Sequence, residues 1–372
     1  MPNITNNDKK SVNETLDSGV LTNGPNLSKF EKSFSKFTNS NYSVGVSSAT
    51  AALHLSLKAL GIGKNDQVIV PDLTFVATAN AVLMTGAVPI MADVNLDDFN
   101  INIESIKKNI TKKTRGIIPV HFAGNPCNMN KIMEIAKKNN LYVVEDCAHA
   151  LGSFYKNKHV GTFGHIGCFS FYPTKNITTL EGGMVITKSK EFSNYIATSR
   201  NHGITKTLEE RYAKDFPWDY DISEAGYNYR MDEIRAVLGI TQLNRINKIN
   251  QNRRNSVKYY NEKFSNIEGI EPQNILNIKE NSCHLYIVKI NHEKFGIDRN
   301  SVSKKLLKRG IQTSVHYKPL HKFSIFKNIK IYDNLKNSNI LYDEILSLPL
   351  YSGISKKEQD IVINELKNIK NN

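Results

Sequence analysis

The segment Asp66–Val94, "DQVIVPDLTFVATANAVLMTGAVPIMADV", decides the predicted fold. It opens with the apolar run "DQVIVP", continues with apolar residues at helical spacing in "TFVATANAVLMTG", and ends with a second apolar run, "VPIMADV". A strand, a helix and a strand in this order are typical of a crossover unit. The segment therefore predicts two strands of a mostly parallel sheet.

The same alternation continues on both sides of this segment. "YSVGV", "RGIIPVH" and "LYVVED" predict strands at 42–46, 115–121 and 141–146, whereas "ATAALHLSLKAL" and "NKIMEIAKKNN" predict helices at 49–60 and 130–140. These strands are apolar on both faces, so helices should cover both sides of the sheet. Residues 42 to 187 thus predict an α/β fold.

The C-terminal part of the chain has a different pattern. A long helical pattern spans 233–264, and a strand at 283–290, a helix at 299–310, a strand at 311–315 and a closing helix at 356–369 follow it. This order predicts a small α+β lobe. We place the large domain at residues 1–250 and the small C-terminal domain at 251–372.

Composition narrows the classes of partner. The 372 residues are 40% hydrophobic and 23% charged, as in a soluble globular protein, and 49 basic against 35 acidic residues give a net charge of +14. This charge favours an anionic partner. We expect no nucleic acid, because zinc spacings and aromatic-basic motifs are absent. We expect no membrane partner either, because Pro71, Asp72 and Pro89 interrupt the longest apolar region.

Cysteine usage and the first residues bear on the compartment. Cys127, Cys147, Cys168 and Cys283 are far apart and form no closely spaced pair, so we expect no metal site and no redox site. The opening "MPNITNNDKK" is polar, without an apolar signal segment. We expect a reducing, cytoplasmic setting.

Two predicted strand ends carry candidate ligands. "LYVVED" ends in Glu145-Asp146, and "YSVGVSS" leads into a helix that begins near Ala49-Thr50. Ligands of α/β sheets bind beyond the carboxyl ends of strands, and a helix N-terminus after small residues suits a phosphate. The dinucleotide and Walker patterns are absent, so we expect a ligand with a single phosphate.

The stretch "CFSFYPTKNITTLEGGMVIT" (168–187) sets Lys175 in a turn-rich segment between two apolar runs. Pyridoxal 5'-phosphate (PLP) needs a lysine for its aldehyde, a carboxylate for its ring nitrogen and an aromatic side chain for its ring face. Asp146 and Phe75 are candidates for the last two roles. The same residues also suit a turn cap and a core aromatic, and His149 equally suits a satisfied core histidine.

Six segments, in order along the chain, resemble one known family. They are "SSATAALHLSLKALGI", "VPDLTFVATANAVLMTGAVPIMADV", "VVEDCAHALGS", "FSFYPTKNITTLEGGMV", "GYNYRMDEIRAVLGITQL" and "HYKPLH". The chain resembles the DegT/StrS group of PLP-dependent sugar-nucleotide aminotransferases, from "GVLTNGPNLSKFEKSF" (19–34) to "LSLPLYSGIS" (346–355). The resemblance implies the α/β fold of fold type I PLP enzymes, with a small C-terminal lobe.

The resemblance also implies how the cofactor is held. Lys175 would be the catalytic residue, which forms a Schiff base with PLP and later carries the proton. Asp146 would pair with the ring nitrogen, His149 would lie near the ring hydroxyl and Phe75 would stack on the ring. The phosphate would bind Ala49, Thr50, Ser170 and Asn228, the last from the neighbouring subunit, so the resemblance implies a homodimer with shared active sites.

For the substrate, the resemblance implies an amino acid donor, usually glutamate, and a nucleotide-linked keto-sugar of polysaccharide biosynthesis. "FPWDYDISEAGYNYRM" (216–231) is similar to members that aminate C4 of UDP-linked keto-sugars, which favours a UDP-4-keto-6-deoxyhexose. The segment 1–40 would cover the substrate. The implied substrate-binding residues are Thr22, Gly24, Pro25, Glu181, Arg230, His316 and Tyr317.

The chain departs from the family pattern at two places, and three alternatives stay open. Ala49-Thr50 stands where the family usually has Gly-Thr. Leu180-Glu181-Gly182-Gly183 stands where the family usually has Gly-Glu-Gly-Gly. One alternative is the sugar dehydratase branch, which replaces the Schiff-base lysine with histidine. The others are a PLP-binding sensor without turnover and an amino-acid aminotransferase of the same fold, whose carboxylate-binding arginine would be Arg309.

Overall fold

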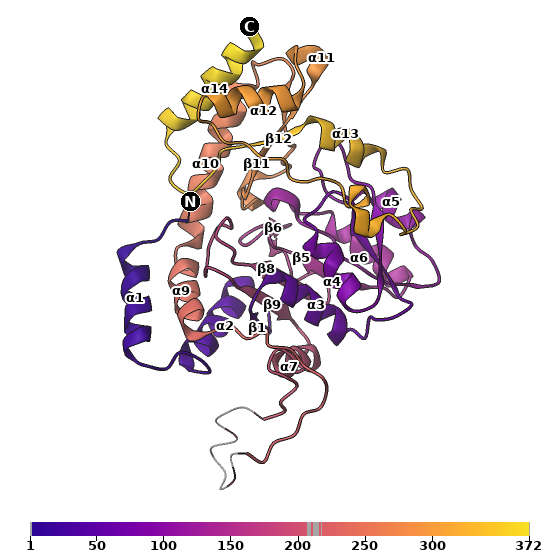
Figure 1. Ribbon diagram of the computed structural model, residues 1–372, viewed down its shortest axis with the longest axis vertical. Coiled ribbons are helices and arrows are strands. Elements are labelled where there is room, and N and C mark those ends of the chain that lie inside the picture. The colour runs from indigo at the N-terminus through magenta and orange to yellow at the C-terminus, as the bar shows by residue number, and fades with distance from the viewer. Residues whose placement is uncertain (1, 207–209, 211–215, 217, 372) are drawn as a thin grey trace.

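A seven-stranded sheet forms the centre of the computed structural model, which describes residues 2–206, 210, 216 and 218–371 (Figure 1). The strand order is β1-β9-β8-β5-β4-β2-β3, and β9 alone runs against the others. The sheet is therefore mostly parallel, as predicted. Its strands are β1 (Tyr42–Val46), β2 (Gln67–Pro71), β3 (Val88–Ala92), β4 (Thr114–Ile117), β5 (Tyr142–Asp146), β8 (Ile166–Ser170) and β9 (Gly183–Thr187).

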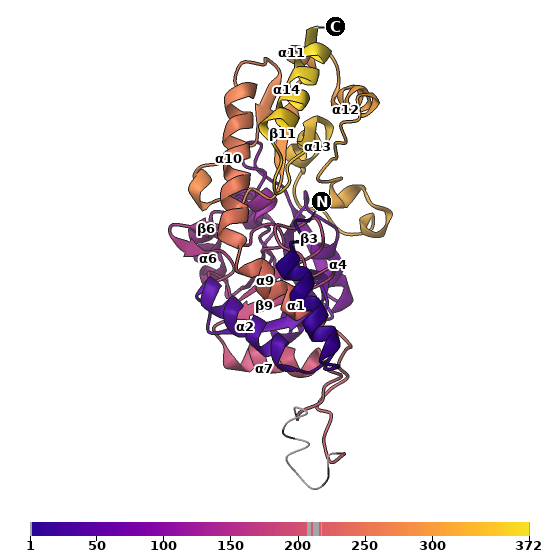
Figure 2. The same cartoon turned by 90° about the vertical axis from the view of Figure 1, so that its left-hand side faces the viewer.

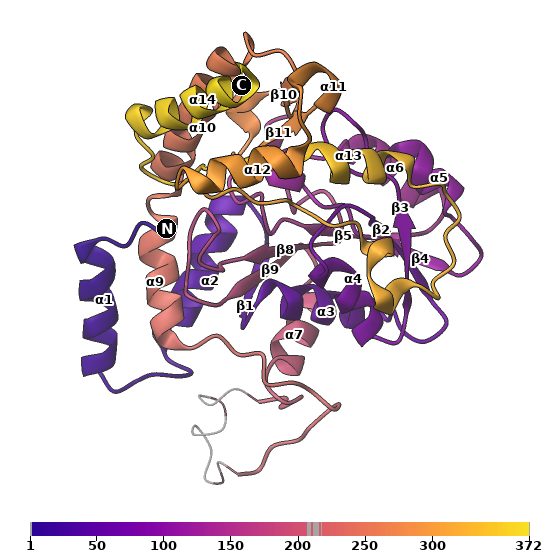
Figure 3. The same cartoon turned by 45° about the horizontal axis from the view of Figure 1, so that its top comes forward.

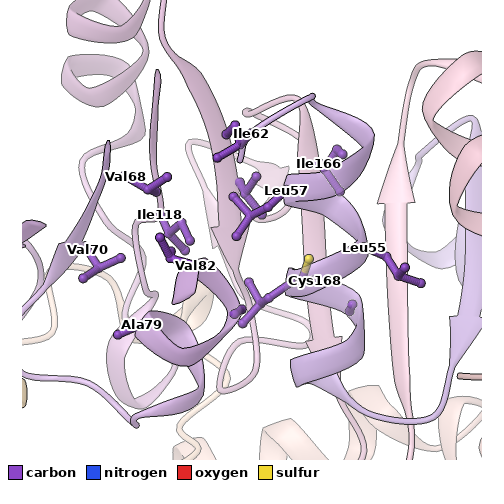
Figure 4. Close-up of a cluster of buried hydrophobic side chains, with 14 of the residues drawn as sticks. Leu55, Leu57, Ile62, Val68, Val70, Ala79, Val82, Ile118, Ile166 and Cys168 are labelled. Atoms are coloured by element: carbon purple, nitrogen blue, oxygen red, sulfur yellow. The ribbon is translucent and has the colours of Figure 1, made fainter. Parts of the chain in front are cut away.

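Side chains alternate between the two faces of this sheet, as the period of two along a strand requires. In β2, Val68 and Val70 join the core under α3 and α4, whereas Ile69 joins the core under α5 and α6. Figure 4 shows the first of these cores, which includes Leu55, Leu57, Val68, Val70 and Val82. Helices thus cover both faces. They are α3 (Ala49–Ala59), α4 (Ala77–Met84), α5 (Ile103–Lys108), α6 (Met129–Lys138) and α7 (Lys190–Ser199).

The N-terminal helices pack on a later helix, and the second of them also contacts β1. Helices α1 (Asn6–Asp17) and α2 (Pro25–Thr38) both pack on α9 (Glu233–Leu243), and Figure 3 shows α1 beside α9. Phe30 and Phe34 of α2 fill the core against Phe169 and Phe171. An ion pair between Arg245 and Asp8, 2.6 Å long, joins the first helix to the end of α9.

A second sheet belongs to the C-terminal lobe, which lies above the large sheet in Figure 2. It has the strands β10 (Ile270–Pro272), β11 (Tyr286–Ile290) and β12 (Ile345–Leu348). Tyr260, Phe264, Val288 and Leu366 are buried in a core of its own. The helices of this lobe are α10 (Ile246–Phe264), α11 (His292–Phe295), α12 (Arg299–Lys308), α13 (Lys336–Glu344) and α14 (Lys356–Asn371).

Short elements connect these parts. The hairpin β6 (Phe154–Tyr155) and β7 (Lys158–His159) precedes β8, and 3₁₀ turns lie at Phe122–Gly124, Ile278–Glu280, Leu320–Lys322 and Ser324–Phe326. In the part of the chain that the structure describes, no helix combines the length and hydropathy that a membrane crossing needs.

Two sequence predictions about the C-terminal part are wrong. The helix predicted at 233–264 is two helices, because the chain turns at Asn244-Arg245, where Arg245 bonds to the N-terminal segment. The strand predicted at 311–315 is reduced to a single bridge between Ser314 and Ser347. Both differences depend on contacts with distant segments, which periodicity does not report.

Candidate functional site

Asp146 is the last residue of β5, and its carboxylate lies at the carboxyl end of the parallel strands. It is 5% exposed. Oδ1 accepts a hydrogen bond from the Ala148 amide (3.0 Å), and Oδ2 accepts one from the Thr78 hydroxyl (2.8 Å). Burial raises the pKa of Asp146, and the hydrogen bonds and the positive charge of Lys175 oppose this effect. Such a buried carboxylate favours a cationic partner.

Glu145, the preceding residue, points to the opposite face of the sheet, where its hydrogen bonds hold β5 in place. His121 Nδ1 accepts the Cys127 amide (3.1 Å), which leaves Nε2–H to donate to Glu145 (3.0 Å). Burial by itself raises the pKa of Glu145, but His121 and the backbone donors lower it overall. The carboxylate also accepts three backbone amides, those of Gly161 (2.7 Å), Phe163 (2.7 Å) and Gly164 (2.6 Å).

This arrangement positions Asp146 and uses the only candidate metal cluster among the described residues. The cluster consists of His121, Glu145 and Cys147, whose ligand atoms lie within 4.8 Å of one another. Burial raises the pKa of the Cys147 thiol well above its usual range, so the thiol is protonated at neutral pH. The His121 amide also donates to the Asp146 carbonyl (3.2 Å). The cluster therefore serves to hold the end of β5.

Lys175 lies in the turn between β8 and β9, where its amide donates to the Tyr172 carbonyl (2.9 Å). Desolvation lowers the pKa of its amine to about 8, while the negative charge of Asp146 acts in the opposite direction. An amine with such a pKa is partly neutral near physiological pH, as a nucleophile or proton acceptor must be. Lys175 thus has the electrostatic environment of a reactive lysine.

His149 and Tyr317 form an aromatic pair beside this lysine. His149 Nδ1 accepts the Ala123 amide (3.3 Å), so Nε2 carries the hydrogen that faces the Tyr317 hydroxyl (3.0 Å). Burial lowers the pKa of His149 well below its usual range, which keeps the ring neutral. The Phe75 ring lies 5.8 Å from the Tyr317 ring and is 55% exposed. An aromatic surface is thus available for a flat ligand.

The start of α3 offers free backbone donors. Ser48 caps the helix by accepting the Ala51 amide (3.1 Å), and the amides of Ala49 and Thr50 are in the first turn, where no intrahelical acceptor exists. Gly183 packs so closely that a Cβ there would lie 2.5 Å from the Ser48 carbonyl. Ser170 pairs with Gly183, so this residue lies close to the helix start. The donors suit a phosphate.

Five of the remaining predicted residues line two separate cavities. His316 and Tyr317 line a cleft of about 680 Å³ together with Lys175. Thr22, Gly24 and Arg230 line a second cavity of about 630 Å³, whose walls also include Arg200, His202 and Lys206. One chain therefore does not bring the predicted substrate residues into a single site. Pro25 is the first residue of α2, Glu181 is exposed, and Asn228 forms a bridge with Asn201.

Sequence reasoning missed several polar residues of the cleft. Thr78, which bonds to Asp146, lies outside the cleft lining, whereas Asn176, Arg253 and His284 line the same cleft as Lys175. Their positions follow from the packing of α4, α10 and the loop before β11, which are far apart in the sequence. The one local signal is the pair Arg253-Arg254 within an otherwise amphipathic helix.

This geometry can be set beside known proteins. A model of the DegT/DnrJ/EryC1/StrS aminotransferase family matches residues 2–367. The chain belongs to this family. The DegT/DnrJ/EryC1/StrS assignment agrees with the resemblance drawn from the six motifs. The chain is 36% identical over 372 residues to the spore coat polysaccharide biosynthesis protein SpsC of Bacillus subtilis. The alignment covers 99% of this chain and 96% of SpsC.

Solved structures agree over the whole chain. PseC of Helicobacter pylori, an aminotransferase involved in the biosynthesis of pseudoaminic acid, is 30% identical with a TM-score of 0.92, over 100% of this chain and 98% of PseC. A Streptococcus pneumoniae relative known in a PMP form is 33% identical with a TM-score of 0.92, over 100% and 98% of the two chains. Like its DegT/DnrJ/EryC1/StrS relatives, the protein is a PLP-dependent sugar aminotransferase.

The residues present fit PLP. A buried carboxylate for the ring nitrogen, a lysine with a lowered pKa and an exposed aromatic ring lie at or after the carboxyl ends of the parallel strands β5, β8 and β2, and free amides at the start of α3 suit the phosphate. In Ala49 the chain departs from the glycine usual in the family. The side chain is small and the amide needed for the phosphate is unaffected, so the departure does not disturb the fit.

Proposed function

We propose that the protein transfers the amino group of glutamate to the keto carbon of a nucleotide-linked sugar, a UDP-4-keto-6-deoxyhexose. The observation that carries this proposal is the electrostatic interaction of Lys175, whose pKa is lowered to about 8, with the buried carboxylate of Asp146. The preference for UDP and for C4 rests on the segment 216–231, of which Pro217 lies outside the described residues.

Each cofactor-binding residue has a defined task in this proposal. Ala49, Thr50 and Ser170 hold the phosphate, and Phe75 stacks on the ring. Asp146 keeps the ring nitrogen protonated. His149 lies near the ring hydroxyl and adds no charge there, because its own ring is neutral. When bound, PLP supplies an electron sink for the carbon next to the transferred nitrogen.

Lys175 carries the proton in both halves of the reaction. Its amine accepts a proton from the α-carbon of the donor and later delivers a proton to the former keto carbon of the sugar. With a pKa of about 8, about a tenth of the free amine is neutral at pH 7. A lysine with an ordinary pKa would be neutral about 300 times less often, so desolvation of this amine directly favours the proton transfer.

We further propose that two chains share each active site. The cavity lined by Thr22, Gly24 and Arg230 then completes the site of the partner, with Pro25 holding the loop at the start of α2. Arg230 in this cavity suits a diphosphate, whereas Arg200 is paired with Glu31 and Lys206 with Asp219. Asn228 lies on the same segment and reaches the phosphate of the partner's cofactor.

An exposed apolar segment supports this assembly. Phe216 is 60%, Trp218 71% and Ile222 56% exposed, and the described part of the segment projects beyond α7 in Figures 1 and 2. Large apolar side chains on a projecting segment mark protein–protein contacts. A second copy of this chain covers them in the proposed dimer, in which Asn228 is delivered by the same segment.

The structure offers little support for the three alternatives. The dehydratase branch replaces the lysine with histidine, whereas Lys175 is present here. Arg309, the arginine considered for an amino-acid aminotransferase, is 69% exposed and pairs with Glu365 (3.6 Å) away from the cleft. A sensor without turnover would not need a lysine with a lowered pKa.

The experiment is a panel of UDP-, GDP- and dTDP-linked 3-keto and 4-keto sugars with glutamate, with product masses as the readout. The expected product is an aminated UDP-linked sugar, formed with stoichiometric 2-oxoglutarate. Lys175→Ala is the matched inactive control, and borohydride treatment of the wild-type protein should fix the cofactor on Lys175. The proposal would be contradicted if the protein aminated only 2-oxo acids and formed no aminated sugar.

A further inference from the structure

The segment 317–338, called the crossing segment below, leaves the small lobe and packs on the large domain. Three of its side chains are buried in the core under α3 and α4, namely Leu320, Phe326 and Leu335. In Figure 3 the segment lies beside α4 before the chain returns to α13. His316, the residue before it, is attached to the small lobe, because its Nδ1 bonds to the Ser347 hydroxyl of β12 (2.7 Å). The chain therefore passes from one lobe to the other between His316 and Tyr317.

Asp72 holds the start of the crossing segment. It follows the last residue of β2 and is 0% exposed. Its carbonyl accepts the Leu320 amide (2.8 Å), Oδ1 accepts the His321 amide (3.0 Å), and Oδ2 accepts His321 Nδ1–H (2.7 Å). The Asp72 amide itself donates to the Ala92 carbonyl at the end of β3 (2.8 Å). These bonds join two consecutive residues of the crossing segment to the carboxyl end of the large sheet.

Tyr317 is the residue of the crossing segment that reaches the proposed cofactor site. Its hydroxyl lies 3.0 Å from His149 Nε2, and its ring lies 5.8 Å from the Phe75 ring. Tyr317 is four residues before His321, and Phe75 is three residues after Asp72. The Asp72–His321 pair therefore joins the two backbone segments that carry these aromatic rings.

A second carboxylate holds the other end of the crossing segment. Asp93 follows the last residue of β3 and is 6% exposed. Its Oδ1 accepts the amide (2.8 Å) and the hydroxyl (2.9 Å) of Ser338, and its Oδ2 accepts the Asn337 amide (2.9 Å). These bonds fix the start of α13, which is far along the chain from Tyr317. The two attachments thus hold one segment, but only the first lies close to the aromatic rings.

We propose that the Asp72–His321 pair positions Tyr317, so that the Tyr317 ring is held against His149 and Phe75 before the cofactor binds. This inference rests on the proposed function, in which Phe75 and His149 contact the cofactor ring. It adds two positioning residues. A binding surface that is already ordered avoids the loss of side-chain freedom that otherwise weakens binding. Hydrogen bonds to a buried carboxylate are strong enough to maintain such order.

The test measures the Kd of pyridoxamine phosphate (PMP) for the apo protein by titration calorimetry. PMP has no aldehyde, so a bond to Lys175 does not contribute to the result. His321→Ala removes the side-chain bond to Asp72 and should raise the Kd about 5- to 10-fold, equal to about 1–1.4 kcal/mol. In His321→Asn the amide nitrogen can donate in place of Nδ1, so the Kd should stay within about twofold of the wild-type value.

Ser338→Ala is the matched control, because it removes one side-chain bond from the second attachment of the same segment. It should lower the melting temperature and leave the Kd for PMP within about twofold of the wild-type value. A general loosening of the crossing segment would instead weaken PMP binding in Ser338→Ala and His321→Ala alike. That outcome would contradict a specific positioning role for His321.

Tyr317→Ala decides whether His321 acts through Tyr317. In the Tyr317→Ala background, His321→Ala should not raise the Kd further, whereas independent effects would multiply. The inference is overturned if His321→Ala binds PMP as the wild type does, or if its full effect persists without the Tyr317 ring. Should His321→Ala fail to fold, His321→Gln enters the same cycle, because its longer side chain moves the amide away from the Nδ1 position. PMP binding requires neither donor nor sugar, so a protein that aminates no UDP-linked sugar refutes the proposed function and leaves this test valid.

Discussion

Replacing Asp146 with Asn should separate the chemistry at this position from its contribution to the fold. The Asn carbonyl can still accept the Ala148 amide, which now bonds to Oδ1 at 3.0 Å. The amide nitrogen then faces the Thr78 hydroxyl, which can turn to accept because it also lies 3.2 Å from the Thr74 hydroxyl. With both hydrogen bonds kept, the free energy of unfolding should change by no more than about 1 kcal/mol.

Activity should fall much further than stability. The variant loses the negative charge that keeps the ring nitrogen protonated, and a hydrogen bond to a charged group contributes about 1.5–3 kcal/mol. The expected loss in kcat is therefore about 10- to 100-fold or more, at 1.36 kcal/mol per tenfold. Chemical denaturation and steady-state kinetics of Asp146→Asn and wild type measure the two effects side by side.

A second readout follows from the charge itself. Asp146 raises the pKa of Lys175, so its removal should let that pKa fall below about 8. The pH dependence of reductive methylation of Lys175 in the apo protein, followed by mass spectrometry, reports this shift. If kcat stays within tenfold of the wild-type value and the pH dependence of Lys175 methylation does not shift, Asp146 is not the partner of the ring nitrogen and of the Lys175 amine.

Three further predictions concern other parts of the site. Glu145→Gln should lose about 3 kcal/mol of stability at pH 7, because an amide cannot accept all four hydrogen bonds. Since the pKa of Glu145 is lowered on folding, the stabilisation by its carboxylate is fully present above the ordinary carboxyl pKa and declines as the pH falls. The denaturation curves of the variant and the wild type should therefore converge in acid. Leu180 has a left-handed backbone (φ 68°), so Leu180→Gly should raise stability by up to about 1 kcal/mol in the same assay, and a loss would show that its side chain packs usefully. Lys175→Ala and Asn228→Asp should restore activity when mixed, because one site of a mixed dimer carries neither change; no gain over Asn228→Asp alone would argue against shared sites.

Much of the catalytic arrangement was predictable because it depends on local order in the chain. Asp146 ends an apolar run and Ala49 begins a helix after two serines, so the rule that ligands bind beyond strand ends placed both at one edge of the sheet. The paired apolar runs around Lys175 likewise indicated a turn between strands. The family motifs then suggested a role for each residue, and the placement of Asp146, Lys175, His149 and Tyr317 is compatible with those roles.

What the tertiary structure decided is the set of contacts between distant segments. The pKa of Lys175 depends on desolvation, and the hydrogen bond from Thr78 to Asp146 joins residues 68 positions apart. Arg253 Nε has no hydrogen-bond partner, whereas carbonyls from two loops bond to Nη1. Residue types and their periodicity determine which elements form and which side they bury. Which polar atoms remain without a partner depends on how those elements pack, and no single segment carries that information.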